Sequence, residues 1–191
     1  EKLIKQANVQ KTLIPEKLTN EMVLSELKSA KGVLIYDIES DPDSRHDFLH
    51  GFVSLERRKN GEWVTEDAEY HPILNIQGNN EEITWIKLKS KLNTFSNWPV
   101  LHYGETEMLS IYRMAKKQGE SEKIIRRIEN NFIDVHSRLR DGWILPVKSY
   151  SLKTIANWLN FRWSKKGASG AKALLWWRQL NNYQVGGKNT K

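Results

Sequence analysis

The sequence predicts an α/β domain with a central mixed five-stranded sheet flanked by helices. Three observations support this: an almost unbroken apolar run at residues 33–39, two strand-like segments after it, and helical periodicity that then alternates with short apolar stretches. Consecutive strands joined by a tight turn pair antiparallel, whereas a later strand reached through a helix lies parallel to the first. The order of the elements therefore indicates a mixed sheet.

The first 30 residues are expected to form a helical arm or linker before the main domain. Residues 16–27 carry apolar side chains at helical spacing just after Pro15, which predicts a helix there. Because the chain begins at Glu1 and not at Met, we interpret it as a segment of a longer protein. The main domain is expected at residues 31–182, and residues 183–191, rich in Gly, Asn and Lys, are predicted to be a flexible tail.

The three leading strands are expected at residues 33–39, at residues 48–57 and within residues 63–74. The first is apolar almost throughout, as buried central strands are, and Asp41-Pro42 ends it. Asn60-Gly61 lies between the second and the third, and this pair is a hairpin turn signal because it tolerates positive φ.

Helices and short strands alternate in the rest of the chain. Periodicity and capping residues predict strands near residues 99–103 and 132–135, and helices over residues 81–95, 105–118, 121–130, 136–140, 152–159 and 170–180. The last helix must cover the sheet, so Trp176 and Trp177 are expected to pack in the core. The alternative is that these two, with Trp143 and Trp163, stack on unpaired bases.

The composition narrows the classes of function. The chain has no cysteine, which excludes disulfides, thiolate nucleophiles and Cys-ligated metals, and fits a reducing, cytoplasmic location. No stretch approaches 18 apolar residues, so we expect no membrane span. The net charge of +7 favours polyanionic partners such as nucleic acids, although scattered basic residues on a soluble surface explain it equally well.

Asp37-Ile38-Glu39 is the strongest local feature. Residues two apart on a strand point to the same face, so both carboxylates converge on one side. Carboxylates held side by side repel each other, and a strand that places two there commonly holds a cation. The alternative is a strand end whose acids simply reach solvent.

Two further acidic positions follow predicted strands. Glu107 lies in the first helical turn after residues 99–103, where its carboxylate can point back over the sheet, whereas Glu105 is suited to the helix N-terminus. Asp134 follows the short strand at residue 132 and precedes Arg138 and Arg140. Helix capping explains Glu107 and Asp134 individually. Together with Asp37 and Glu39 they form the carboxylate set that two Mg²⁺ or Mn²⁺ ions need for phosphodiester cleavage.

At this point the chain resembles a known group of enzymes. Asp37-Ile38-Glu39 is similar to the first motif, Asp-x-Glu, of the DEDD superfamily of 3′–5′ exonucleases, and residues 102–107 match its second motif in length, with Glu107 in place of the catalytic Asp. More closely, residues 37–180 resemble the RNase H-like (YprB-type) domain of predicted RecB-family nucleases. The matching stretches are residues 101–104, 132–134, 145–153 and 170–178, of which Ser-Tyr-Ser-Leu-Lys at 149–153 is the most distinctive.

This resemblance implies an RNase H-like fold and hydrolysis of DNA or RNA that depends on Mg²⁺ or Mn²⁺, with two ions expected or one. It implies Asp37, Glu39 and Glu107 as metal ligands and, less firmly, Asp134. In such proteins this domain often follows a separate nuclease-like region, so an upstream domain of the same chain is an expected partner. One departure stands out: residues 163–180 contain no acidic residue, although the third DEDD motif places its last Asp, preceded by Tyr or His, on the final helix.

Other side chains are expected to assist. His102 could position the water or the scissile phosphate, or could be hydrogen-bonded within the strand end; Tyr150 could orient water, although packing is favoured. Basic residues expected to contact the nucleic-acid backbone are Arg138, Arg140, Lys148 and Lys153.

We therefore predict a metal-dependent nuclease, a 3′–5′ exonuclease acting on single-stranded ends by a two-metal-ion mechanism. The alternatives are a catalytically degenerate nuclease-like domain that binds nucleic acid, which the missing fourth acid favours, and a phosphatase acting on small phosphoesters.

Overall fold

A mixed sheet forms the centre of the molecule. The computed structural model describes the chain except for residues 22, 76–80, 163–166, 168 and 187–191. Within the described residues the central sheet has five strands in the order β4-β3-β2-β5-β6. Its strands are β2 (Gly32–Asp41), β3 (His46–Glu56), β4 (Glu69–Leu74), β5 (Val100–His102) and β6 (Phe132–Asp134). Strands β2, β3 and β4 pair antiparallel, while β5 and β6 run parallel to β2, so the predicted mixed five-stranded sheet is confirmed.

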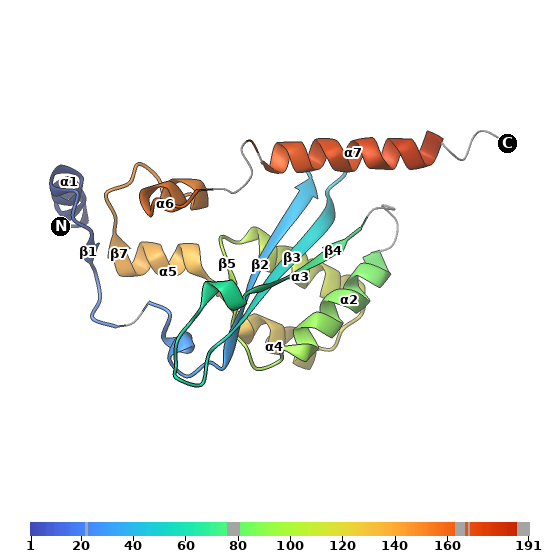
Figure 1. Ribbon diagram of the computed structural model, residues 1–191, viewed down its shortest axis with the longest axis horizontal. Helices are drawn as coiled ribbons and strands as arrows, with labels where there is room; N and C mark the ends of the chain where they lie inside the picture. The colour runs from blue at the N-terminus through green and yellow to red at the C-terminus, as the bar shows by residue number, and fades with distance from the viewer. Residues whose placement is uncertain (22, 76–80, 163–166, 168, 187–191) are drawn as a thin grey trace.

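The two faces of β2 have different surroundings. Leu34 and Tyr36 are almost fully buried and face the main hydrophobic core together with Phe52 of β3. Three helices pack on this face: α2 (Glu81–Thr94), α3 (Thr106–Lys117) and α4 (Glu122–Asn131) (Figure 1). On the opposite face, Ile35 is 46% exposed. Residues Asp37 and Glu39 share that face with Ile35, because side chains alternate along a strand.

Asp47 of β3 ties helix α3 to the β2–β3 hairpin. Its carboxylate accepts hydrogen bonds from Ser40 at 2.5 Å, from Ser110, and from Arg113 at 2.6 Å. The bonds to α3 fix how that helix lies along the hairpin. This matters for the site because Glu107 lies in the first turn of the same helix.

The last helix crosses the end of β2. Helix α7 (Gly170–Gly186) follows α5 (Val135–Gly142), β7 (Trp143–Ile144) and α6 (Leu152–Trp158). In Figure 1 the elements α5, β7 and α6 lie to the left of the central sheet, and α2 lies to its right. Trp177 stacks on Phe48 with ring centroids 5.0 Å apart, and its indole N–H donates to the carbonyl of Asn75 at 3.2 Å. Trp177 therefore packs as predicted.

Trp176 does not pack in the core. It is 60% exposed, so the expectation that both tryptophans are buried is wrong for this residue. Neighbouring residues on a helix point about 100° apart, and Trp177 takes the side that faces the sheet. Trp163 lies outside the described residues. The helix also continues to Gly186, beyond its predicted end at residue 180, and the rest of the predicted tail, residues 187–191, is outside the described part of the chain.

The predicted helix over residues 16–27 is wrong. Residues Glu16–Lys17 form a short strand, β1, which pairs antiparallel with β7, and Ser25–Lys28 is a single 3₁₀ turn. The helix of the arm, α1, lies instead at Lys2–Thr12. The apolar residues at helical spacing are used differently: Val23 packs against Gly142, where a β-carbon would overlap the valine side chain. Helical spacing alone could not reveal this partner.

The arm is anchored to the region that follows α5. The side-chain amides of Gln6 and Gln10 donate to the carbonyls of Leu145 and Val147, and the backbone N–H of Leu18 donates to the carbonyl of Gly142. No helix among the residues that the structure describes is long and apolar enough to cross a membrane.

The start of β2 gives a test of the packing. The Trp98 indole lies against Gly32, and a β-carbon at residue 32 would overlap three atoms of its ring. We expect Gly32→Ala to lower the free energy of unfolding by about 1–3 kcal/mol, because overpacking forces neighbours to move. Urea denaturation measures this. The loss should shrink when Gly32→Ala is made in a Trp98→Leu background, and an equal loss in both backgrounds would show that the indole is not the obstacle.

Candidate active site

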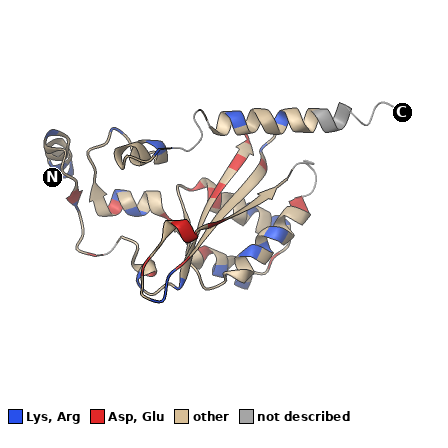
Figure 2. Ribbon diagram, in the orientation of Figure 1, with Lys and Arg blue, Asp and Glu red and all other residues tan. Residues whose placement is uncertain are grey.

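The parallel strands bring acidic residues to one edge of the sheet. Leu34 and Ile35 of β2 pair with Val100 and Leu101 of β5, and His102 pairs with Asp134 of β6. The carboxyl ends of these three strands therefore meet at the same edge, which is where ligands bind in open α/β sheets. Acidic residues colour the second half of β2 in Figure 2. This arrangement brings together acids from elements far apart in the sequence: Asp37 and Glu39 of β2, Glu107 of α3 and Asp134 of β6.

Asp37 and Glu39 lie on the face of β2 opposite the main core. Burial is the largest effect on both, and it raises the pKa of each carboxyl above its ordinary value. The charge of Asp37 raises the pKa of Glu39 further, so the two groups repel each other as the sequence predicted. The side chain of Asp37 nevertheless reaches solvent.

Helix α7 begins against Glu39. A β-carbon at Gly170 would lie 2.8 Å from Glu39 Oε2, so any side chain at this position would require the Glu39 carboxylate to move. Eight residues further on, Arg178 binds Asp41 at 2.5 Å and Asp43 at 2.5 Å. The final helix therefore contributes a wall to the site, although it contributes no carboxylate from residues 163–180.

Glu107 is the most perturbed acid of the group. It is only 7% exposed, and its Oε2 atom is buried without a hydrogen-bond partner. Burial raises its pKa to about 7, and the negative charges of Asp37 and Asp134 contribute to the rise. Leaving a carboxylate oxygen buried and unpaired is costly unless a proton or a cation compensates it.

His102 is buried beside Glu107 but does not compensate it. Its Nδ1 is 3.9 Å from Glu107 Oε2, whereas it lies 2.7 Å from the carbonyl of Gly104. A carbonyl can only accept, so Nδ1 carries the proton and donates it to this oxygen. Burial lowers the pKa of His102, which keeps the ring neutral near pH 7. The geometry matches the alternative of a histidine hydrogen-bonded at the strand end.

Asp134 is occupied by backbone contacts. One of its oxygens, Oδ1, accepts the N–H of His136 at 2.9 Å, which caps α5, and the N–H of Gly104 at 2.8 Å. These bonds fix the turn between β5 and α3, in which Gly104 has a φ of 106°. Asp134 therefore holds the turn that leads to Glu107, as the capping alternative anticipated.

Tyr70 is a residue of this region that the sequence did not single out. It lies on β4 opposite Val53, and its ring reaches over Gly51, which pairs with Asp37. The charges of Asp37 and Glu39 raise the pKa of its hydroxyl, after the larger effect of burial. The alternation of side chains along β4 could have placed Tyr70 on the side of the sheet away from the core. Only the register of β4, β3 and β2 shows that this is the side of Asp37 and Glu39.

The predicted basic residues have different settings. Arg138 is engaged in an ion pair with Glu26 at 2.5 Å. Arg140 lines a hollow of about 530 Å³ next to Asp134, while Lys148 and Lys153 are exposed. Tyr150 has a structural role: its hydroxyl donates to the carbonyl of Trp143 at 3.0 Å and accepts the N–H of Leu145 at 3.0 Å.

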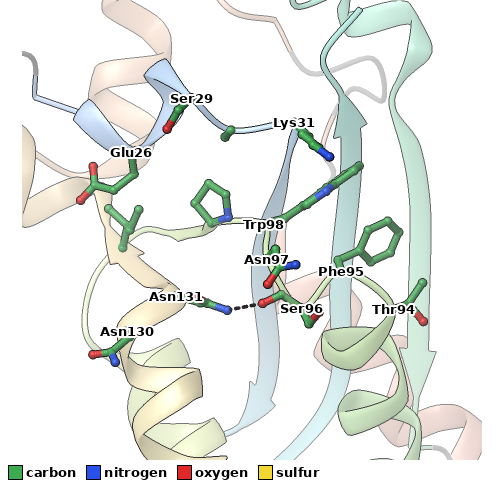
Figure 3. Close-up of a pocket in the computed structure, with 13 residues that line it drawn as sticks. Glu26, Ser29, Lys31, Thr94, Phe95, Ser96, Asn97, Trp98, Asn130 and Asn131 are labelled. Atoms are coloured by element: carbon green, nitrogen blue, oxygen red, sulfur yellow. Dashed lines mark hydrogen bonds between the residues drawn. The ribbon is translucent and has the colours of Figure 1, made fainter.

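A separate hollow of about 560 Å³ lies at the opposite edge of the sheet (Figure 3). Lys31 and Pro99, which precede β2 and β5, are part of its lining, and Asn131 donates to the carbonyl of Ser96 at 2.8 Å across its floor. Glu26 is the one acidic residue among its described lining residues. Its position at the amino ends of the strands does not match a metal-dependent site.

The acidic edge fits a hard divalent cation in its chemistry. Carboxylate oxygens are what Mg²⁺ and Mn²⁺ prefer, and the buried, unpartnered oxygen of Glu107 is a group that a cation would satisfy. In the described part of the chain, no three His, Asp or Glu side chains lie close enough together to form a ready coordination shell. The structure thus brings carboxylates to one edge without an assembled coordination shell, and Glu107 is drawn into the protein.

The fold and this edge define an RNase H-like, nuclease-type α/β domain. A family model described as the RNase H superfamily matches residues 34–190, and the chain belongs to this superfamily. The match begins in β2 and includes all four predicted acidic residues, Asp37, Glu39, Glu107 and Asp134. Comparisons with curated proteins and with solved structures gave no match.

The buried carboxyl of Glu107 gives a pH-dependent prediction. Its pKa of about 7 in the folded protein exceeds the ordinary value of 4.5, so the folded state binds the proton more tightly than the unfolded state. The protonated Glu107 carboxyl therefore makes its full contribution to the free energy of unfolding below about pH 4.5. This contribution is lost as the pH rises through 7. In a metal chelator, Glu107→Gln should therefore raise the melting temperature clearly at pH 8 and little at pH 5.

Glu105→Gln is the matched control, because Glu105 is exposed in the same helical turn. It should change the melting temperature by the same small amount at both values of pH, because only the interaction with the helix N-terminus is lost. Equal effects of Glu107→Gln at pH 5 and pH 8 would contradict a buried carboxyl with a raised pKa.

Proposed function

We propose that this protein is a metal-dependent nuclease that hydrolyses phosphodiester bonds of DNA or RNA. More specifically, we propose a 3′–5′ exonuclease of the DEDD type, close to the YprB-type domains, that uses two Mg²⁺ or Mn²⁺ ions, or one. The observation that carries the proposal is the buried, unpartnered Oε2 of Glu107 at the edge where Asp37 and Glu39 also lie. Membership of the RNase H superfamily supports it.

Asp37, Glu39 and Glu107 are the residues that would hold the cation. When bound, a divalent ion supplies the positive charge that activates water near neutral pH and stabilises the attacking and leaving oxygens. The same charge would favour the ionised form of Glu107, whose proton must leave before both of its oxygens can act as ligands. Asp37 is open to solvent, so a phosphodiester can approach it from the uncovered face of the sheet.

His102 and Asp134 act on this site through the turn that contains Gly104. Both bind Gly104, one at its carbonyl and the other at its N–H. They set where α3 begins and hence where Glu107 is placed. In the proposed enzyme they are positioning residues, although both were predicted as catalytic, and Asp134 as a ligand.

The nucleic acid is proposed to approach as a single-stranded end. Arg140 beside Asp134, with the exposed Lys148 and Lys153, supplies positive charge for its phosphates, whereas Arg138 is held by Glu26. A cytoplasmic location and an upstream nuclease-like domain in the same chain are also part of this proposal, and rest on the absence of cysteine and on the family resemblance.

A nucleic-acid-binding domain without catalytic activity is the second candidate. Two observations favour it: residues 163–180 supply no acid, and the described residues contain no ready three-ligand cluster. Such a domain would keep the basic residues and bind the metal weakly or not at all.

Cleavage of a labelled single-stranded oligonucleotide in Mn²⁺ tests the proposal. We expect Asp37→Ala to lower the rate at least about 100-fold, because it removes a metal ligand and the interaction of that metal with the reacting oxygens. Glu66→Ala is the control, since Glu66 is an exposed acid on the short 3₁₀ helix before β4. Degradation by Asp37→Ala at the rate of the wild-type protein would rule out the mechanism.

Titration calorimetry with Mn²⁺ separates the two candidates. The wild-type protein should bind Mn²⁺ at pH 8, and Glu107→Gln should bind it at least about tenfold more weakly, because the neutral amide is a poorer ligand than a carboxylate. If the wild-type protein binds oligonucleotides but takes up no Mn²⁺, the binding domain is the correct description.

A further inference from the structure

Tyr70 of the edge strand β4 lies on the same uncovered face of the sheet as the acids of β2. In the register of the three strands, Ile35 is opposite Val53, and Val53 is opposite Tyr70. Asp37 is two residues from Ile35 and therefore points to the same side. In the part of the chain that the structure describes, no helix covers this face at Tyr70, which is 56% exposed.

The ring of Tyr70 extends across β3 toward Asp37. A β-carbon at Gly51 would lie 3.2 Å from the Tyr70 hydroxyl and 3.2 Å from its Cε2 atom, so the end of the ring occupies the space above this glycine. Gly51 is the direct partner of Asp37 on β2. Opposed residues have β-carbons about 4.5–5.5 Å apart, which places the hydroxyl in the neighbourhood of the Asp37 carboxylate.

The chemistry of this hydroxyl differs from that of the neighbouring acids. A tyrosine hydroxyl carries a proton near neutral pH and can donate a hydrogen bond. Ionised carboxylates can only accept. Two donors at this end of the sheet, among the residues that the structure describes, are engaged elsewhere: His102 donates to Gly104, and Arg178 binds Asp41 and Asp43.

From this geometry we infer that Tyr70 is a substrate-positioning residue, whose hydroxyl donates to a non-bridging oxygen of the phosphate brought to Asp37 and Glu39. The inference rests on the proposed function and adds a contact from the edge strand. A phosphate on the open face brings negative oxygens toward two acids, and a neutral donor beside them orients the group without competing for the cation. A side chain at Gly51 would require the ring to shift by a few tenths of an ångström.

Tyr70→Phe isolates the hydroxyl, because it keeps the ring and its packing. We expect kcat/KM on a single-stranded oligonucleotide to fall about 10- to 100-fold, the loss of one hydrogen bond to a charged group. Most of the fall should be in kcat, and Tyr70→Ala should lose about as much as Tyr70→Phe. Mn²⁺ affinity and melting temperature should match the wild-type protein, and Tyr112→Phe, on helix α3, is the matched control with no expected effect.

Two results would overturn the inference. The first is that Tyr70→Phe is as active as the wild-type protein. The second is that Tyr70→Phe weakens Mn²⁺ binding in proportion to its loss of activity, because Tyr70 would then act only through the metal-binding acids.

A binding assay separates this inference from the proposed function. Fluorescence anisotropy with a labelled oligonucleotide in Ca²⁺ should show affinity about two- to threefold lower for Tyr70→Phe than for the wild-type protein, the smaller part of the fall in kcat/KM. If the wild-type protein binds without cleaving, the proposed catalysis fails, while this difference still supports Tyr70 as a phosphate contact. Equal affinities, or no binding by the wild-type protein, would overturn it.

Discussion

The cost of burying carboxyl groups together at one edge of the sheet is the constraint on which the rest of this site depends. Strands β2, β5 and β6 are parallel, so the acids that follow or end them are brought to the same edge. Glu107 carries most of this cost, because one of its oxygens is buried and unpartnered. Its neighbours His102 and Asp134 use their hydrogen bonds on Gly104 and leave the cost uncompensated.

One face of the sheet packs the main core, and the other face carries the proposed site. The face toward α2, α3 and α4 holds the main core, and Asp47 links this side to the hairpin. Among the described residues, α7 covers the other face near the end of β2, where Gly170 meets Glu39 and Arg178 binds Asp41. The side chain of Asp37 on this face is exposed, as the proposed action on a polymer requires.

Much of the candidate site could be predicted from local patterns. Alternation on a strand placed Asp37 and Glu39 on one face, and the strand-to-helix junction pointed to Glu107. The hydrogen bond between Asp134 and the N–H of Gly104, and Tyr70's approach over Gly51, could not be predicted in this way. Each depends on a partner at least 19 residues away in the sequence, and no local pattern records such a distance.

The sequence by itself determined the α/β class, the mixed sheet and most helices, because hydrophobic periodicity and capping act within a few residues. Only the tertiary structure determined the conformation of residues 16–27. In place of the predicted helix, this segment pairs with β7 and packs Val23 on Gly142. It also decided that Trp177 packs on Phe48 while Trp176 stays exposed. In these cases the free energy comes from contacts between distant segments, which helical spacing cannot specify.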